Sequence, residues 1–121
     1  MIDHLTLKVR DLSKARAFYL AALEPLGYEI LMEAPGGLGL GAEKKPDLWL
    51  FPDPENVRPL HLAFRAPNRK AVDAFHAAAL AAGGRDNGRP GIRAHYHPHY
   101  YGAFVLDHDG NNIEAVTHRP E

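Results

Sequence analysis

Apolar and polar residues alternate in two short stretches that open the two halves of the chain. Residues between Ile2 and Val9 alternate, with Leu5, Leu7 and Val9 on one face and His4 on the more polar face. The pattern returns from Leu60 to Ala66, again with a histidine, His61, on the more polar face. Alternation of this kind is typical of a strand with one buried side. We therefore predict two strands that each present one histidine.

Each of these strands is followed by apolar residues at helical spacing. Asp11 is placed to cap the first helix, which Pro25 and Gly27 should end. Asn68 is placed to cap the second, which should close at Gly83. The sequence thus predicts a strand followed by a helix twice.

Shorter patterns predict the remaining elements. Strands are expected at residues 28–33, 38–42, 47–51, 100–106 and 112–117, with a proline-rich linker at 52–59 and a tight turn at 107–111. The polar segment 85–98 has no clear period, and we place a strand at 92–96.

The two halves are related by an internal repeat. The stretches 4–27 and 61–84 align without a gap at an offset of 57 residues, and eight of the 24 pairs are identical. A fixed internal period points to a duplicated structural unit. We predict a single α+β domain over residues 1–121, built from two βαβββ modules at about 1–55 and 58–121. Together they should form a curved, mainly antiparallel, cup-shaped sheet with helices on its outer face.

Composition excludes several classes of function. The 121 residues contain no cysteine, so disulfides and thiolate sites are absent, and the formal net charge is only -1. Scattered basic residues argue against nucleic acid or a membrane as a partner. Because Met1 leads directly into a strand pattern, a cytoplasmic protein is expected. Eight histidines raise the prospect of metal or proton chemistry.

Three residues could together bind a metal. Alternation along the last strand places Glu114 on one face with Asn112. If a pseudo-twofold axis relates the modules, His4, His61 and Glu114 converge in the cup, within one chain or across two. Two imidazoles and one carboxylate suit Fe(II), Mn, Ni or Zn. The alternative is that each histidine only hydrogen-bonds a neighbour.

Three segments carry a family resemblance: residues 2–12 (IDHLTLKVRDL), 17–19 (AFY) and 104–114 (FVLDHDGNNIE). With them the chain resembles the vicinal oxygen chelate superfamily, which includes glyoxalases, extradiol dioxygenases, fosfomycin resistance thiol transferases and bleomycin resistance proteins. The resemblance implies a divalent metal held by His4, His61 and Glu114, and a homodimer that pairs modules across subunits.

The chain departs from the family pattern at three places. Residues 47–51 (DLWLF) lack the fourth, carboxylate ligand usual in glyoxalases, which favours a three-ligand centre. Residues 95–101 (HYHPHYY) lack the serines of fosfomycin enzymes. His108 replaces the usual proline of the turn.

The segment 95–101 is a second candidate for function. On an extended chain His95, His97 and His99 would share one face, although Pro98 makes a regular strand doubtful. The segment is either a lid that binds substrate or moves a proton, or a solvated loop.

A metal-dependent, glyoxalase-like lyase or isomerase acting on a small molecule is the leading hypothesis. Glu114, Tyr100 and His99 are the candidate catalytic residues. The candidate substrate-binding residues are Arg65, Tyr96, Tyr100, Tyr101 and Trp49. A metal-free sequestration protein of the bleomycin resistance type is the alternative, and a dioxygenase or thiol transferase of the same superfamily is a further one.

Overall fold

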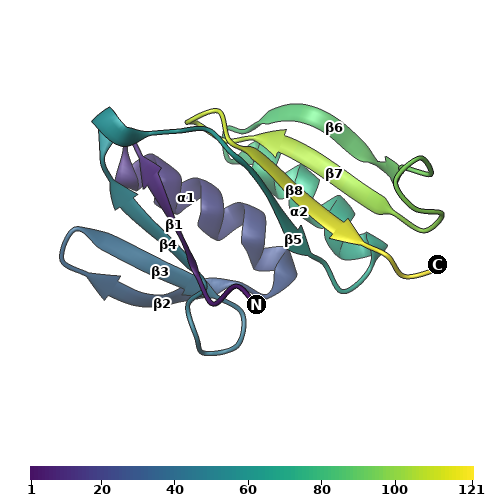
Figure 1. Cartoon of the computed structure of the whole chain (residues 1–121), viewed down its shortest axis with the longest axis horizontal. Helices are drawn as coiled ribbons and strands as arrows, with labels where there is room; N and C mark the ends of the chain where they lie inside the picture. The colour runs from purple at the N-terminus through teal and green to yellow at the C-terminus, as the bar shows by residue number, and fades with distance from the viewer.

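The computed structural model describes all 121 residues as two modules of the same design (Figure 1). The first module comprises β1 (Leu5–Val9), α1 (Leu12–Leu23), β2 (Glu29–Ala34), β3 (Gly37–Gly41) and β4 (Leu48–Pro52). The second comprises β5 (His61–Arg65), α2 (Arg69–Ala81), β6 (Arg85–Ile92), β7 (Tyr101–Leu106) and β8 (Asn112–Thr117). Two short 3-10 helices, η1 (Glu24–Leu26) and η2 (Pro54–Asn56), complete the chain. The duplicated βαβββ design is confirmed.

Each module has its own four-stranded mixed sheet. The strand orders are β1-β4-β3-β2 and β5-β8-β7-β6, with β1–β4 and β5–β8 parallel and the other neighbours antiparallel. The predicted α+β class is confirmed, and most strand pairs are antiparallel as expected. The predicted single sheet is divided in two, because no ladder of hydrogen bonds joins β1 to β5.

The caps of both helices are those predicted from the sequence. The Asp11 carboxylate accepts a hydrogen bond from the Lys14 N–H at 3.0 Å, and the Asn68 side chain accepts one from the Ala71 N–H at 2.9 Å. These bonds satisfy amide groups that a helix start leaves without partners. Neither helix is long and apolar enough to cross a lipid bilayer.

Strand alternation separates a core face from an open face in both sheets. Leu7, Val9, Leu48 and Leu50 are buried in a core that also receives side chains from both helices and from the second module. Figure 1 shows both helices behind the sheets. The opposite faces of the sheets are therefore free to carry functional side chains.

The predicted strand at 92–96 is wrong. The polar segment before it forms β6, which ends at Ile92, and residues 93–99 form a turn instead. The Arg93 carbonyl accepts hydrogen bonds from the Tyr96 and His97 amides, and the Arg93 N–H donates to the Tyr100 carbonyl at 2.7 Å. These hydrogen bonds close the loop that connects β6 to β7. β6 is bulged around Gly88 and has few apolar side chains, so the sequence lacks the alternation by which a strand is recognised.

The turn between β7 and β8 is fixed by the first module. Asp107 accepts hydrogen bonds from the Tyr19 hydroxyl of α1 and from the Asp109 and Asn111 amides. The Asp109 carboxylate accepts a bond from the Arg10 guanidinium at 3.0 Å. The predicted turn is confirmed, and its contacts anchor the start of β8 to the other half of the chain.

Candidate functional site

His61 and Glu114 meet on the open face of the second sheet. In the parallel pair β5–β8, Ala63 lies opposite Glu114, and His61 precedes Ala63 on the same face. The His61 Nε2 atom is 2.7 Å from Glu114 Oε1. The Glu114 side chain is buried, whereas that of His61 is 53% exposed. Carboxylates are rarely buried without a partner, and His61 supplies one to Glu114 from an accessible position.

Tyr100 contacts the other oxygen of the same carboxylate. Its hydroxyl donates a hydrogen bond to Glu114 Oε2. Burial, and next the hydrogen bond to Glu114, raise the pKa of the Tyr100 phenol well above its usual value. The phenol therefore keeps its proton at neutral pH and remains a donor to Glu114. His61, Glu114 and Tyr100 form one connected polar cluster, the three-residue site below.

His4 lies on the open face of the other sheet. Its Nδ1 atom is 2.6 Å from Asp3 Oδ1, and the Lys45 ammonium is 2.9 Å from the same oxygen. The hydrogen bond from His4, followed by that from Lys45, lowers the pKa of Asp3. The His4 side chain is 55% exposed. His4 therefore remains accessible, and its hydrogen bond is made within its own module.

One chain does not bring His4 to the three-residue site. Figure 1 shows β1 and β5 running in opposite directions, so β1 begins at the bottom of the view and β5 at the top. A five-residue strand is about 16 Å long, whereas a metal-bound imidazole nitrogen lies about 2 Å from its metal. No group of three His, Asp or Glu side chains in the chain is arranged to hold a metal. Of the three predicted ligands, the structure therefore unites His61 with Glu114 and leaves His4 apart.

Trp49 occupies the position in the first module that Glu114 occupies in the second. Thr6 lies opposite Trp49 in β1–β4, and Ala63 lies opposite Glu114 in β5–β8. Thr6 and Ala63 correspond at the 57-residue offset of the repeat. The first module thus offers an indole where a carboxylate would complete the symmetry.

The 93–99 loop places a group of aromatic rings beside Glu114. The Tyr100 ring lies edge-to-face with Tyr96 at 5.0 Å and with His118 at 5.1 Å. His97 packs against His118 at 5.4 Å. Sequence reasoning missed His118 because it lies near the chain end. The pairing of Tyr101 with Thr117 brings it beside the loop.

The three loop histidines do not share one face. His95 packs against Tyr96 at 4.1 Å, whereas the His97 Nδ1 atom accepts a hydrogen bond from the His99 amide at 3.1 Å. The turn replaces the extended chain that this expectation required. His99, the predicted proton-transfer residue, contacts His97 rather than Glu114.

Tyr101 lies on the wrong side of its sheet for the predicted substrate contact. Its hydroxyl donates to Asp73 of α2 at 2.6 Å, and the Arg69 guanidinium lies 5.0 Å over its ring. The hydrogen bond to Asp73, and next burial, raise the pKa of Tyr101 to about 12. Since side chains alternate along a strand, Tyr100 and Tyr101 cannot both face the open side.

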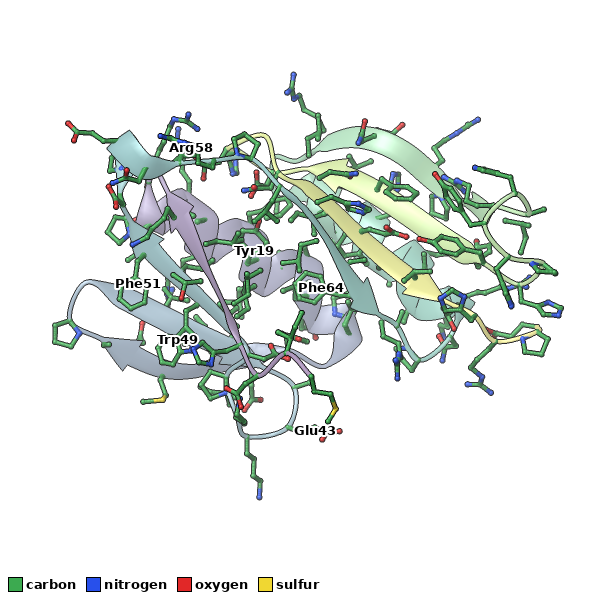
Figure 2. The ribbon with its side chains drawn as sticks, in the orientation of Figure 1. Tyr19, Glu43, Trp49, Phe51, Arg58 and Phe64 are labelled. Atoms are coloured by element: carbon green, nitrogen blue, oxygen red, sulfur yellow. The ribbon has the colours of Figure 1, made fainter.

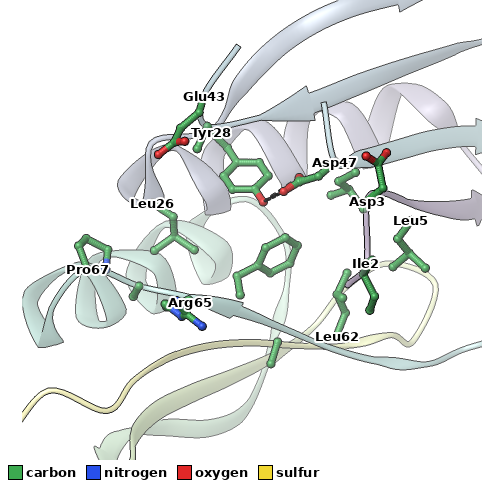
Figure 3. Close-up of a pocket in the computed structure, with 15 residues that line it drawn as sticks. Ile2, Asp3, Leu5, Leu26, Tyr28, Glu43, Asp47, Leu62, Arg65 and Pro67 are labelled. Atoms are coloured by element: carbon green, nitrogen blue, oxygen red, sulfur yellow. Dashed lines mark hydrogen bonds between the residues drawn. The ribbon is translucent and has the colours of Figure 1, made fainter. Parts of the chain in front are cut away.

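A separate groove lies where the edges of β1 and β5 approach each other. Its volume is about 820 Å³, and its lining includes Leu5 of β1, Phe64 and Arg65 of β5, and Asp47. Figure 3 shows Tyr28 and Asp47 in the lining of the groove. The Tyr28 hydroxyl donates hydrogen bonds to both Asp47 oxygens, at 2.8 and 2.9 Å. Arg65 lines this groove, and by strand alternation it lies on the same face of β5 as His61.

The sequence of this chain matches a known family. Residues 1–115 match the model of the glyoxalase/bleomycin resistance protein/dioxygenase superfamily. The chain belongs to this superfamily. The match covers both modules, including the strands that carry His61 and Glu114. A comparison with curated proteins finds no match.

Solved structures of the superfamily have the same fold. A glyoxalase/bleomycin resistance protein from Albidiferax ferrireducens T118 is 27% identical, with 95% of this chain and 97% of the other covered and a TM-score of 0.83. A family enzyme from Burkholderia phytofirmans PsJN is 20% identical, with 98% of both chains covered and a TM-score of 0.73. A lactoylglutathione lyase from Agrobacterium tumefaciens is 22% identical, with coverages of 97% and 92% and a TM-score of 0.69.

Two side chains of the three-residue site have donor atoms of a kind that metals bind. The His61 nitrogen and the Glu114 carboxylate are donors of the kind that Zn, Ni, Mn and Fe(II) accept. Two protein ligands are fewer than the three that catalytic sites of this kind usually provide. The chain therefore fits a divalent metal only if a third ligand joins His61 and Glu114.

Proposed function

We propose that the protein is a metal-dependent, glyoxalase-like enzyme of the lyase or isomerase type, which binds two neighbouring oxygens of a small substrate at a divalent metal. The observation that carries this proposal is the contact between the buried Glu114 carboxylate and His61 on an open sheet face. The bound metal would supply Lewis-acid stabilisation of negative charge on a substrate oxygen.

The third ligand in this proposal is His4 of a second copy of the chain. His4 and His61 hold equivalent positions in the repeat, yet they lie at opposite ends of neighbouring strands within one chain. In a symmetric homodimer, the first module of one copy can face the second module of the other, which gives two equivalent sites. This arrangement supports His4, His61 and Glu114 as ligands without any change inside a chain.

The remaining residues near the metal would position the substrate and move a proton. Tyr100 would hold Glu114 in place through its hydroxyl, and Tyr96 and His118 would form an aromatic wall beside it. His99 contacts His97, which in turn packs against His118 of this wall.

Metal content tests the proposal. Protein purified without a histidine tag is loaded with Zn, Mn, Ni or Fe(II), desalted and analysed for metal. We expect one metal per chain, and loss of the metal in His4→Ala, His61→Ala and Glu114→Gln. His95→Ala is the matched control, since this loop histidine packs against Tyr96 and is not one of the proposed ligands, and it should keep the metal.

A mixing experiment tests whether two copies share the site. In a mixed dimer of His4→Ala and Glu114→Gln chains, one site contains all three ligands and the other lacks two. Refolding the two variants together should therefore restore metal to about half of the mixed dimers' sites. A wild-type protein that folds but binds no metal would refute the proposal of a metal-dependent enzyme. Metal binding without recovery in the mixture would instead place the site within one chain.

A metal-free binding protein is the second candidate, and Trp49 is the observation that favours it. An indole in the position equivalent to Glu114 offers stacking area where a ligand to metal is missing. Under this candidate, a small molecule would bind wild type and Glu114→Gln with equal affinity, and added metal would change neither value.

A further inference from the structure

Two aromatic rings lie side by side on the open face of the first sheet. Leu48 and Leu50 of β4 are buried in the core, so Trp49 and Phe51 point to the opposite face. Their ring centroids are 6.2 Å apart and their planes differ by only 24°. Figure 2 shows both side chains over the sheet formed by β3 and β4. The two nearly parallel rings are here named the aromatic platform.

Glycines of β3 allow the platform to lie flat. Gly39 is paired with Trp49, and a Cβ atom on Gly39 would lie 2.9 Å from the indole Cζ3. A Cβ atom on Gly37 would overlap the Phe51 ring. Real Cβ atoms do not make such close contacts, so each ring rests directly on backbone that bears no side chain. Replacing Gly39 would tilt the indole without removing it.

A positive charge and a hydroxyl border the platform. Thr6 lies opposite Trp49, and Lys8 lies opposite Phe51 on the same face of β1. The Lys8 ammonium is 3.8 Å from Asp53 Oδ2, at the long limit for an ion pair, and its side chain is 47% exposed. Exposed pairs of this kind are weak, so Lys8 can turn toward an anion on the platform.

We propose that the aromatic platform binds the planar ring of a small aromatic anion, with the ring stacked on Trp49 and Phe51 and its acidic group near Lys8. Parallel rings favour a flat partner, because offset stacking gains contact over a whole ring face. The assignment of this ring to the substrate rests on the proposed function, since His4 and the platform share one sheet face. The substrate class is then an aromatic or conjugated acid bearing neighbouring oxygens.

Trp49 is the only tryptophan of the chain and reports directly on the platform. Benzoate and cyclohexanecarboxylate have the same charge and similar size, but only benzoate is planar and aromatic. Each is titrated into metal-free protein while Trp49 emission is followed. We expect benzoate to shift the emission and to bind about three- to tenfold more tightly than cyclohexanecarboxylate.

Three variants separate stacking from charge. Gly39→Ala keeps both rings but tilts the indole, and Phe51→Leu removes half of the platform, so each should abolish the preference for benzoate. Lys8→Gln should lower the binding affinity for both acids by a similar factor and reduce the effect of salt on binding. Leu80→Ala, a change of an exposed apolar residue on α2, is the matched control and should retain the preference.

Each other result overturns the platform as a ligand site. Equal binding of the two acids, or a preference that survives both Gly39→Ala and Phe51→Leu, would exclude stacking on these rings. Trp49 emission that responds to protein concentration but not to benzoate would show that a second copy covers the platform. Because these titrations contain no metal, their failure leaves the proposed metal site to its own test, and absence of metal binding leaves the platform result intact.

Discussion

Replacing Tyr19 by phenylalanine removes one hydroxyl group from the contact between the two modules. The Tyr19 side chain is buried, and its hydroxyl donates to Asp107 in the turn that leads into β8. The ring of phenylalanine fills the same space, so the change deletes a hydrogen bond and leaves the packing in place. We expect a measurable loss of stability without loss of fold.

The size of the loss follows from the partners that Asp107 keeps. A hydrogen bond to a charged group contributes about 1.5–3 kcal/mol to stability. Asp107 retains bonds from the Asp109 amide and from the amide and side chain of Asn111, so its charge stays compensated. The lower part of the range, about 1.5–2 kcal/mol, is therefore expected. Unfolding entropy of about 2.1 cal/mol/K per residue converts this loss to a fall in Tm of about 6–8 °C.

Urea denaturation and calorimetry measure the loss, with Tyr28→Phe as the matched control. The Tyr28 hydroxyl also donates to a carboxylate, that of Asp47, but this contact is exposed. Because water replaces such a bond readily, the control should lose less than about 1 kcal/mol. If Tyr19→Phe costs no more than Tyr28→Phe, the buried contact does not hold the modules together and the reasoning is refuted.

Three further predictions concern neighbouring contacts. Burial, and next the charge of Asp107, raise the pKa of Tyr19, so above about pH 10 the unfolded chain loses a proton that the folded chain keeps. Stability should therefore fall with rising pH there, and less steeply in Tyr19→Phe; equal slopes in urea titrations would contradict this. Tyr100→Phe should cost about 1–2 kcal/mol in urea, because buried Glu114 loses a donor, and a neutral effect would mean that the contact is not formed in solution. Arg10→Met should cost about 0.5–1 kcal/mol at low salt and less in 1 M NaCl, and a salt-independent loss would rule out the ion pair with Asp109.

Strand alternation made the open faces of both sheets predictable. Alternation fixes which residues of one strand share a face, so the faces of His61 and of Glu114 could each be assigned from the sequence. That the two side chains share one sheet face depends on the pairing of β5 with β8. The same rule separates Tyr100 from Tyr101, and applying it would have excluded Tyr101 from the site. The polar, bulged strand β6 has no such period, and its position depends on pairing with β7. Contacts between segments distant in sequence, such as that between Tyr19 and Asp107, cannot be predicted from the periodicity of apolar residues.

The two modules differ in length at one place that matters for the site. Thr6 and Ala63 correspond at an offset of 57, whereas Trp49 and Glu114 correspond at 65, so the second module has eight more residues between these points. Two residues connect β2 to β3, but eight connect β6 to β7. The longer connection is the loop whose Tyr96 and Tyr100 rings lie beside Glu114. The two open faces of the repeat are therefore unequal: one carries a buried carboxylate beside the longer loop, and the other carries the nearly parallel rings of Trp49 and Phe51. This difference between the faces is consistent with the proposed binding of substrate oxygens on one side and of a planar ring on the other.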